Sequence, residues 1–178
     1  PVPGTGKPDP ALMKAYLAKY PETKRFLDYM ATMPLPNSFA NGTYYSINAF
    51  RFTNAAGKTQ TVRWSFVPEA PFGALDKATL DKLPKDYLFD DIVARLQKGP
   101  QRWHMFVTLP DPGDVTNNAT IAWPASRRKI EVGTLVLQRA EPEETGPCRD
   151  ITFDPTILPG GVSLSDEDRK STRLNSSH

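Results

Sequence analysis

The sequence predicts an α+β protein in which helices surround an antiparallel sheet or barrel. Two patterns lead to this fold class. Apolar side chains recur at helical spacing over the first 34 residues, whereas several stretches after residue 44 alternate apolar and polar side chains as strands do. A single helical stretch interrupts these strands, and the sequence contains no internal repeat or heptad pattern. An antiparallel arrangement of the strands, roofed by helices, therefore follows.

Two short helices are predicted near residues 10–19 and 22–33. Asp9 followed by Pro10 supplies an N-cap and a proline at the first helical position, and Pro21 starts the second helix. Both stretches carry apolar side chains three or four residues apart, which is the spacing of one helix face.

A β-hairpin is predicted next. Strands near 44–53 and 58–67 flank the sequence Asn-Ala-Ala-Gly at residues 54–57, whose residue types are typical of a turn. In the second strand polar side chains, including Arg63, alternate with apolar ones, so one face is expected to be buried. The apolar face consists of Val62, Trp64 and Phe66.

One helix and two further strands complete the predicted elements. The helix, near 86–98, has one apolar side chain per turn and ends at Gly99. The strands lie near 102–109 and 129–138, and the last one is apolar on both faces toward its end. Four strands with an inserted helix favour an antiparallel barrel or sheet.

Composition and charge narrow the class of protein. A chain of 178 residues with 39% hydrophobic residues can form one domain with a real core. Residues 168–178 hold three of the 22 basic and one of the 20 acidic residues, so the rest of the chain has no net charge. Neither nucleic acid nor an anionic membrane is therefore an expected partner. No apolar run approaches the ~20 residues of a membrane helix, so we expect a soluble protein, cytoplasmic or periplasmic, of unknown oligomeric state.

Individual polar residues identify no reaction by themselves. His104, the only histidine before residue 168, has no neighbours at metal-ligand spacing and is interpreted as a surface or network histidine. Asp90 and Asp91 point about 100° apart on a helix, so they are interpreted as a charged face and not as a catalytic pair. Cys148 is the only cysteine and can form no internal disulfide.

Several motifs occur in a fixed order between residues 41 and 166. Phe50 to Gly57 has the form Phe-x-x-x-Asn-x-x-Gly, and Trp123-Pro124 is followed by Ile-x-Val-Gly-x-Leu-x-Leu from Ile130. Phe153 to Val162 has the form Phe-Asp-Pro-x-x-x-x-x-Gly-Val. Together these motifs resemble the haem catalase family, and more closely its smaller branch of catalase-related peroxidases.

The resemblance implies that residues 1–167 are a partial catalase-like haem-binding domain. Its fold would be a partial antiparallel β-barrel with surrounding helices, and its cofactor would be haem b. The parent protein would be an oxidoreductase that decomposes or reduces hydrogen peroxide in the response to oxidative stress. Hydrogen peroxide and a small reductant would be its partners.

The resemblance also assigns site residues. It places the distal His and Asn before Pro1 and the proximal Tyr ligand after residue 167, so this chain contains no catalytic residue and is expected to be inactive alone. The residues just before Phe50 would line the haem, and Asn48 would stand where large catalases have His. The expected haem contacts are Ser46, Ile47, Asn48, Ala119 and Phe153.

Residues 168–178, DRKSTRLNSSH, differ from the rest of the chain. They contain a single large apolar residue, Leu174. The same eleven residues are encoded by one frame of a widely used sequencing adapter. We therefore expect a non-native or disordered tail that packs against nothing.

Two alternative functions remain open at this stage. A catalase-like allene oxide synthase would keep the fold and the haem but would isomerise fatty-acid hydroperoxides. A ligand-binding β-barrel of the lipocalin type would have no redox chemistry.

Overall fold

The computed structural model describes residues 9–142, 144–152, 154 and 157–165. The chain divides into two compact units, Pro1–Pro34 and Leu35–His178. The described residues of the first unit form helices and no strand, and the second unit contains an antiparallel sheet with helices beside it. The structure therefore has both predicted classes of element, helices and antiparallel strands.

The first unit consists of two consecutive helices, α1 (Pro10–Lys19) and α2 (Pro21–Thr32). The Asp9 carboxylate accepts a hydrogen bond from the Ala11 amide at 2.8 Å, and Pro10 occupies the first helical position. Both predicted helices are confirmed to within one residue at each end. Neither α1 nor α2 contains a buried residue.

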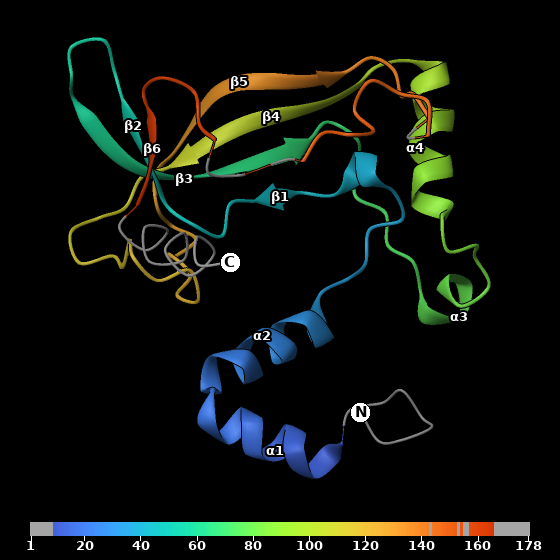
Figure 1. Ribbon diagram of the computed structural model, residues 1–178, viewed down its shortest axis with the longest axis horizontal. Helices are drawn as coiled ribbons and strands as arrows, with labels where there is room; N and C mark the ends of the chain where they lie inside the picture. The colour runs from blue at the N-terminus through green and yellow to red at the C-terminus, as the bar shows by residue number, and fades with distance from the viewer. Residues whose placement is uncertain (1–8, 143, 153, 155–156, 166–178) are drawn as a thin grey trace. The chain divides into compact units, whose positions relative to one another are not determined.

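The second unit is built on one antiparallel sheet (Figure 1). Its strands follow the order β5-β4-β3-β2-β6, and β1 also pairs with β3. Barrel closure requires the two outermost strands to pair, and β5 and β6 do not. The predicted combination of an antiparallel sheet with helices is confirmed, and the described strands form a sheet that is not closed into a barrel. The strands are β1 (Tyr44–Tyr45), β2 (Phe50–Thr53), β3 (Thr59–Pro68), β4 (Gln101–Thr108), β5 (Lys129–Leu137) and β6 (Val162–Leu164).

The predicted strand over 44–53 is in fact two strands. Tyr45 pairs with Ser65 and Phe50 pairs with Val62, so four residues, 46–49, lie opposite only two residues of β3. The extra residues interrupt the ladder and bend the strand away from its partner. Alternation of side-chain types could not reveal this bulge, because the apolar pattern continues on both sides of it.

The turn that joins β2 to β3 is confirmed. The side-chain oxygen of Asn54 accepts hydrogen bonds from the amides of Ala56 and Lys58, both at 3.0 Å. Gly57 has φ of 76°, a backbone conformation that glycine adopts without strain. All four turn residues are exposed, and a Cβ added to Gly57 would meet no atom within 4 Å.

The predicted burial of one face of β3 is confirmed only at Val62, because Ser65 on the opposite face is also buried, at 3% exposure. Val62 is buried at 2% exposure, but Trp64 and Phe66 are half-buried. Their rings meet edge to face with centroids 5.2 Å apart. Arg63, on the opposite face, is also half-buried, because a loop lies over it.

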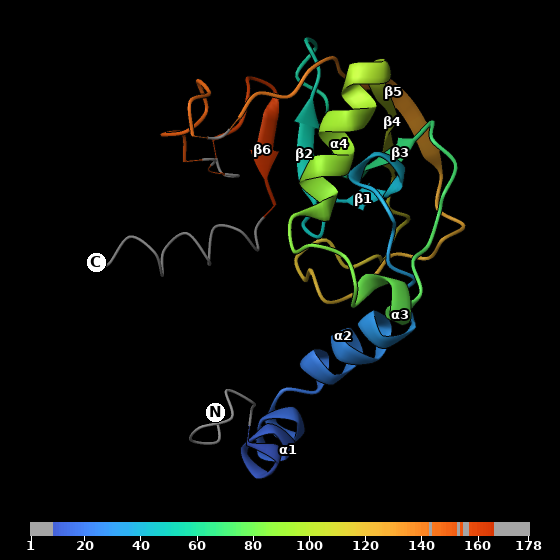
Figure 2. The same ribbon diagram turned by 90° about the vertical axis from the view of Figure 1, so that its right-hand side faces the viewer.

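Two helical elements stand beside the sheet, α4 (Tyr87–Lys98) and the short 3-10 helix η1 (Phe39–Asn41). They lie at the end where β3 and β5 finish and β4 begins (Figures 1 and 2). The rings of Phe39 and Phe89 join η1 to α4, with centroids 5.4 Å apart. The predicted helix near 86–98 is confirmed.

Three short elements escape prediction from the sequence: η1, α3 (Lys77–Leu80) and β6. Each is too short to show a period. β5 carries apolar side chains on both faces, yet only Val136 is shielded from solvent among its nine residues. It lies at the end of the strand order, so it has a neighbour on one side only.

Candidate functional site

Three of the predicted haem contacts lie in the bulge between β1 and β2. Ser46 is bonded twice to Trp64: its amide donates to the carbonyl at 2.8 Å, and its hydroxyl accepts from the amide at 2.9 Å. At the other end of the bulge Ala49 is buried at 1% exposure. Between these fixed ends Asn48 is half-buried and Ile47 is 70% exposed. The bulge therefore holds an apolar side chain out of the sheet on an anchored backbone.

The fourth predicted contact, Ala119, lies in a long loop between β4 and β5. The Leu109 amide donates to the Arg128 carbonyl at 2.9 Å and closes the loop at its base. Arg63 on β3 donates to the carbonyls of Ile121 at 2.9 Å and Asn118 at 3.2 Å. Ala119 is half-buried between these two carbonyls.

These two segments are attached to consecutive residues of β3. The bulge is bonded to Trp64 and the loop to Arg63. Two segments far apart in the sequence are thus bonded to neighbouring positions in the middle of one strand. Phe153, the fifth predicted contact, lies outside the described residues, as does the predicted tail 168–178.

Ion pairs stabilise the loop from within. Arg127 binds the Asp114 carboxylate through two hydrogen bonds of 2.6 and 2.9 Å and reaches Asp111 at 2.9 Å. The hydrogen bonds from Arg127 are the main reason that the pKa of Asp114 is lowered. The Asp114 side chain is only 8% exposed, so the pair lies beneath the loop surface.

A second feature is an apolar cavity of about 420 Å³ between the sheet and the two helical elements beside it. No polar group contributes to its exposed lining. Its size falls within the range of small-molecule sites. The lining residues are Phe39, Tyr44, Phe66, Phe89, Ile92, Trp103, Leu135 and Leu137.

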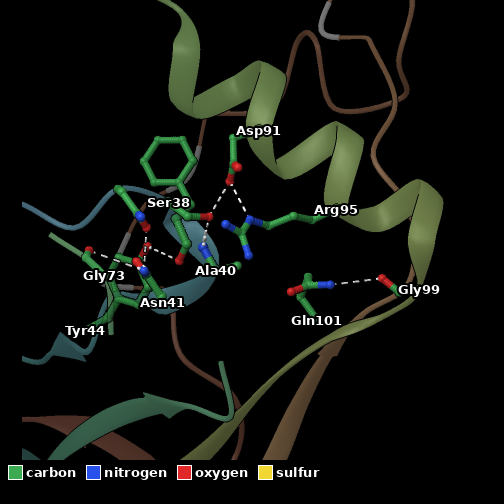
Figure 3. Close-up of polar contacts among 11 residues, drawn as sticks. Ser38, Ala40, Asn41, Tyr44, Gly73, Asp91, Arg95, Gly99 and Gln101 are labelled. Atoms are coloured by element: carbon green, nitrogen blue, oxygen red, sulfur yellow. Dashed lines mark hydrogen bonds and ion pairs between the residues drawn. The ribbon is translucent and has the colours of Figure 1, made fainter. Parts of the chain in front are cut away.

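Polar side chains join η1 to α4 near this cavity, and we call Ser38, Asp91 and Arg95 the polar clasp (Figure 3). The Ser38 hydroxyl donates to the Asp91 carboxylate and accepts from the Ala40 amide at 3.0 Å. Arg95 donates to the same carboxylate at 2.8 Å. Asp90 is exposed, as expected for a charged face, whereas Asp91 is half-buried and accepts from Ser38 of another element, so the interpretation is wrong for Asp91 alone.

Further bonds fix the segment that contains η1. The Trp103 indole donates to the Gly42 carbonyl at 3.3 Å, and the Tyr44 hydroxyl donates to the Phe39 carbonyl at 2.7 Å. Burial raises the pKa of Tyr44. Asn41 is buried, and its amide contacts the Asn37 side chain and the backbone of Gly73 (Figure 3).

His104 has carboxylate partners on both sides. Its Nδ1 lies 2.7 Å from Glu131 of β5, and its Nε2 lies 3.3 Å from Glu69 just after β3. The prediction of a network histidine is confirmed. Within the described residues no group of three or more His, Cys, Asp or Glu side chains could hold a metal ion. Cys148 is exposed and forms no disulfide.

Comparison with known proteins decides the family. The family model described as Catalase matches residues 1–176. The chain belongs to the catalase family. It is 40% identical to a catalase-related peroxidase of Synechococcus elongatus over 94% of this chain and 49% of that protein. It is also 32% identical to a catalase-related peroxidase of Mycolicibacterium paratuberculosis, over 75% of this chain and 42% of that one.

Solved catalase structures share the fold. A bacterial catalase superposes with a TM-score of 0.79 at 20% identity, over 98% of this chain and 36% of its own. A fungal catalase gives a TM-score of 0.70 at 20% identity, over 79% of this chain and 30% of its own. The predicted family and its catalase-related peroxidase branch are confirmed. Neither alternative, the hydroperoxide isomerase or the non-redox barrel, is favoured by these relatives.

The chain spans about half the length, or less, of the curated relatives that it matches. No helix in the described part of the chain is long and apolar enough to cross a membrane.

Proposed function

We propose that this chain is the part of a haem-dependent oxidoreductase that lines the haem b of a catalase-related peroxidase. The full-length protein consumes hydrogen peroxide and takes electrons from a small reductant or from a second peroxide. Family membership and the 40% identity to a catalase-related peroxidase carry this proposal.

The bulge of residues 46–49 fits a flat apolar group. Ile47 is 70% exposed although both ends of its segment are fixed in the sheet. Burying such a side chain stabilises by about 1.5–3 kcal/mol. A porphyrin face placed against Ile47 would supply that burial without any rearrangement of the backbone.

Haem iron supplies the two-electron chemistry with peroxide when the group is bound. The residues of this chain would bind the haem and orient it. Ile47 supplies an apolar contact, Asn48 an amide beside it, and Ala119 a methyl group from the loop. Ser46 keeps the bulge attached to β3 through its bonds to Trp64. Phe153 remains a contact proposed from the resemblance.

His104 is not proposed to act as an acid or a base. Its two ring nitrogens already face Glu131 and Glu69. A general base must lie within hydrogen-bond reach of the proton it takes, and these carboxylates occupy both positions. The catalytic His, Asn and Tyr are therefore proposed to come from the rest of the full-length protein.

Expression of the full-length gene with added hemin tests the function. We expect a Soret band, together with oxygen release or donor oxidation from hydrogen peroxide well above that of free hemin. The 178-residue chain is the matched control, and it should not exceed free hemin. A full-length protein without haem uptake or peroxide turnover would contradict the proposal, and turnover by the 178-residue chain would place the catalytic residues within it.

A further inference from the structure

The loop of residues 110–127 contains neither helix nor strand. Loops longer than about 12–15 residues that lack secondary structure are uncommon and are often functional. This loop is closed at its base by the bond from Leu109 to Arg128 and braced inside by Arg127 and Asp114. These contacts fix the two ends of the loop, and Ala119 lies outside the part of the loop that they fix.

Arg63 holds the part of the loop that carries Ala119. Its two terminal nitrogens bind the carbonyls of Asn118 and Ile121, which stand on either side of Ala119 in the chain. The planar guanidinium has five donors in a rigid fork, so it suits this pair of hydrogen bonds better than an ammonium group does.

The same guanidinium stacks on the loop's tryptophan. The central carbon of Arg63 lies 4.6 Å from the centroid of the Trp123 ring. The Trp123 indole in turn donates to the Val115 carbonyl at 2.7 Å. Arg63 thus binds the loop directly at residues 118 and 121. It is also linked to Val115, because the Trp123 ring on which it stacks donates to the Val115 carbonyl.

We propose that Arg63 is a positioning residue of the haem site, which fixes the turn 118–121 and so sets where the Ala119 methyl meets the haem. This role rests on the function proposed above. Arg63 itself need not touch the haem, because it acts through the backbone on either side of Ala119.

Substitution of Arg63 in the full-length, haem-loaded protein tests this role. Arg63→Lys keeps the charge but loses the fork and the stacking. We expect faster hydrogen exchange over peptides 115–123 and a rise in the haem dissociation rate on the order of tenfold, the size of one lost charge-assisted hydrogen bond. Arg102→Lys, at an exposed arginine of β4, is the control and should change neither quantity.

A double-mutant cycle separates positioning from general loosening. Ala119→Gly removes the methyl group through which Arg63 is proposed to act. In that background Arg63→Lys should still speed loop exchange but should change haem dissociation by less than twofold, because interacting sites are not additive.

Three results would overturn the role. They are unchanged exchange in Arg63→Lys, unchanged haem dissociation despite a loosened loop, and a full effect of Arg63→Lys in the Ala119→Gly background. A protein that takes up no haem at all would overturn the proposed function together with this role. A haem-loaded protein in which Arg63→Lys changes neither loop exchange nor haem dissociation would overturn the role alone.

Discussion

The segment 36–45 contains only short regular elements and the loop 110–127 contains none, and the two are fixed in different ways. The middle of the segment lies in the core: Ser38, Ala40 and Asn41 are all at or below 4% exposure. The loop lies at the surface and is fixed by Arg63 from below and by the Arg127–Asp114 pair inside. The segment is held by burial together with the polar clasp, and the loop is held mainly by hydrogen bonds and ion pairs of two arginines.

Because of this difference, changes in the segment 36–45 should affect the stability of the unit, whereas changes in the loop should affect ligand binding. A change in the segment 36–45 disturbs packing shared by α4, β1 and β4, so it should destabilise the whole unit. A change in the loop should loosen the loop and leave the sheet intact. This separation can be tested in the full-length protein, where each effect can be measured beside haem binding.

The largest effect is expected from Trp103→Ala. Trp103 is 3% exposed, lines the apolar cavity and donates to Gly42. Truncating a buried Trp costs about 3–5 kcal/mol, so the thermal unfolding midpoint should fall by many degrees. Trp103→Phe keeps most of the packing, so its thermal unfolding midpoint should lie between those of Trp103→Ala and the unchanged protein. A midpoint unchanged in Trp103→Ala would show that the segment does not depend on this side chain.

A smaller loss is expected from Asp91→Ala in the polar clasp. The change leaves Ser38, at 0% exposure, without its acceptor and Arg95 without its partner. An unsatisfied buried polar group costs about 1–3 kcal/mol, which urea unfolding can measure. The control is Asp28→Ala, which breaks the exposed Lys24–Asp28 pair of α2 and should cost less than about 0.5 kcal/mol. Equal losses in the two variants would contradict the structural importance of the clasp.

The smallest effect, local to the loop, is expected from acid. Because the pKa of Asp114 is lowered in the folded protein, its contribution is complete above the unfolded value of about 4 and is lost as the pH falls through the folded pKa. Hydrogen exchange over residues 110–127, corrected for intrinsic rates, should therefore accelerate below about pH 4. Asp114→Asn should show fast loop exchange already at neutral pH. Identical pH profiles in the two proteins would rule out the Asp114–Arg127 pair as the cause.

The sequence predicts those parts of the fold that depend on neighbouring residues. Asp9 and Pro10 mark the start of α1, and the residues 54–57 mark the hairpin, because caps and turns are local. The bulge at 46–49 and the strand β6 depend on pairing with distant residues, so no local pattern indicates them. Barrel closure is likewise a property of strand pairing, and the open order β5-β4-β3-β2-β6 could not be read from alternation.

The candidate site shows the same limit. Ser46, Ile47, Asn48 and Ala119 were reached by resemblance to a family, and their attachment to adjacent residues of β3 is visible only in the structure. Arg63 appears in the sequence as one polar residue of an alternating strand. Its role depends on carbonyls 55 or more residues away, and backbone carbonyls leave no trace in residue types.

The hairpin turn at residues 54–57 offers a practical entry point to this protein. Its four residues are exposed, and the space around Gly57 is open. Exposed turns of this kind accept insertions and chain breaks better than any other part of a fold. A fluorophore, an affinity peptide or a new pair of chain ends could therefore be introduced there, so that haem loading and loop motion are followed without touching the residues on which either depends.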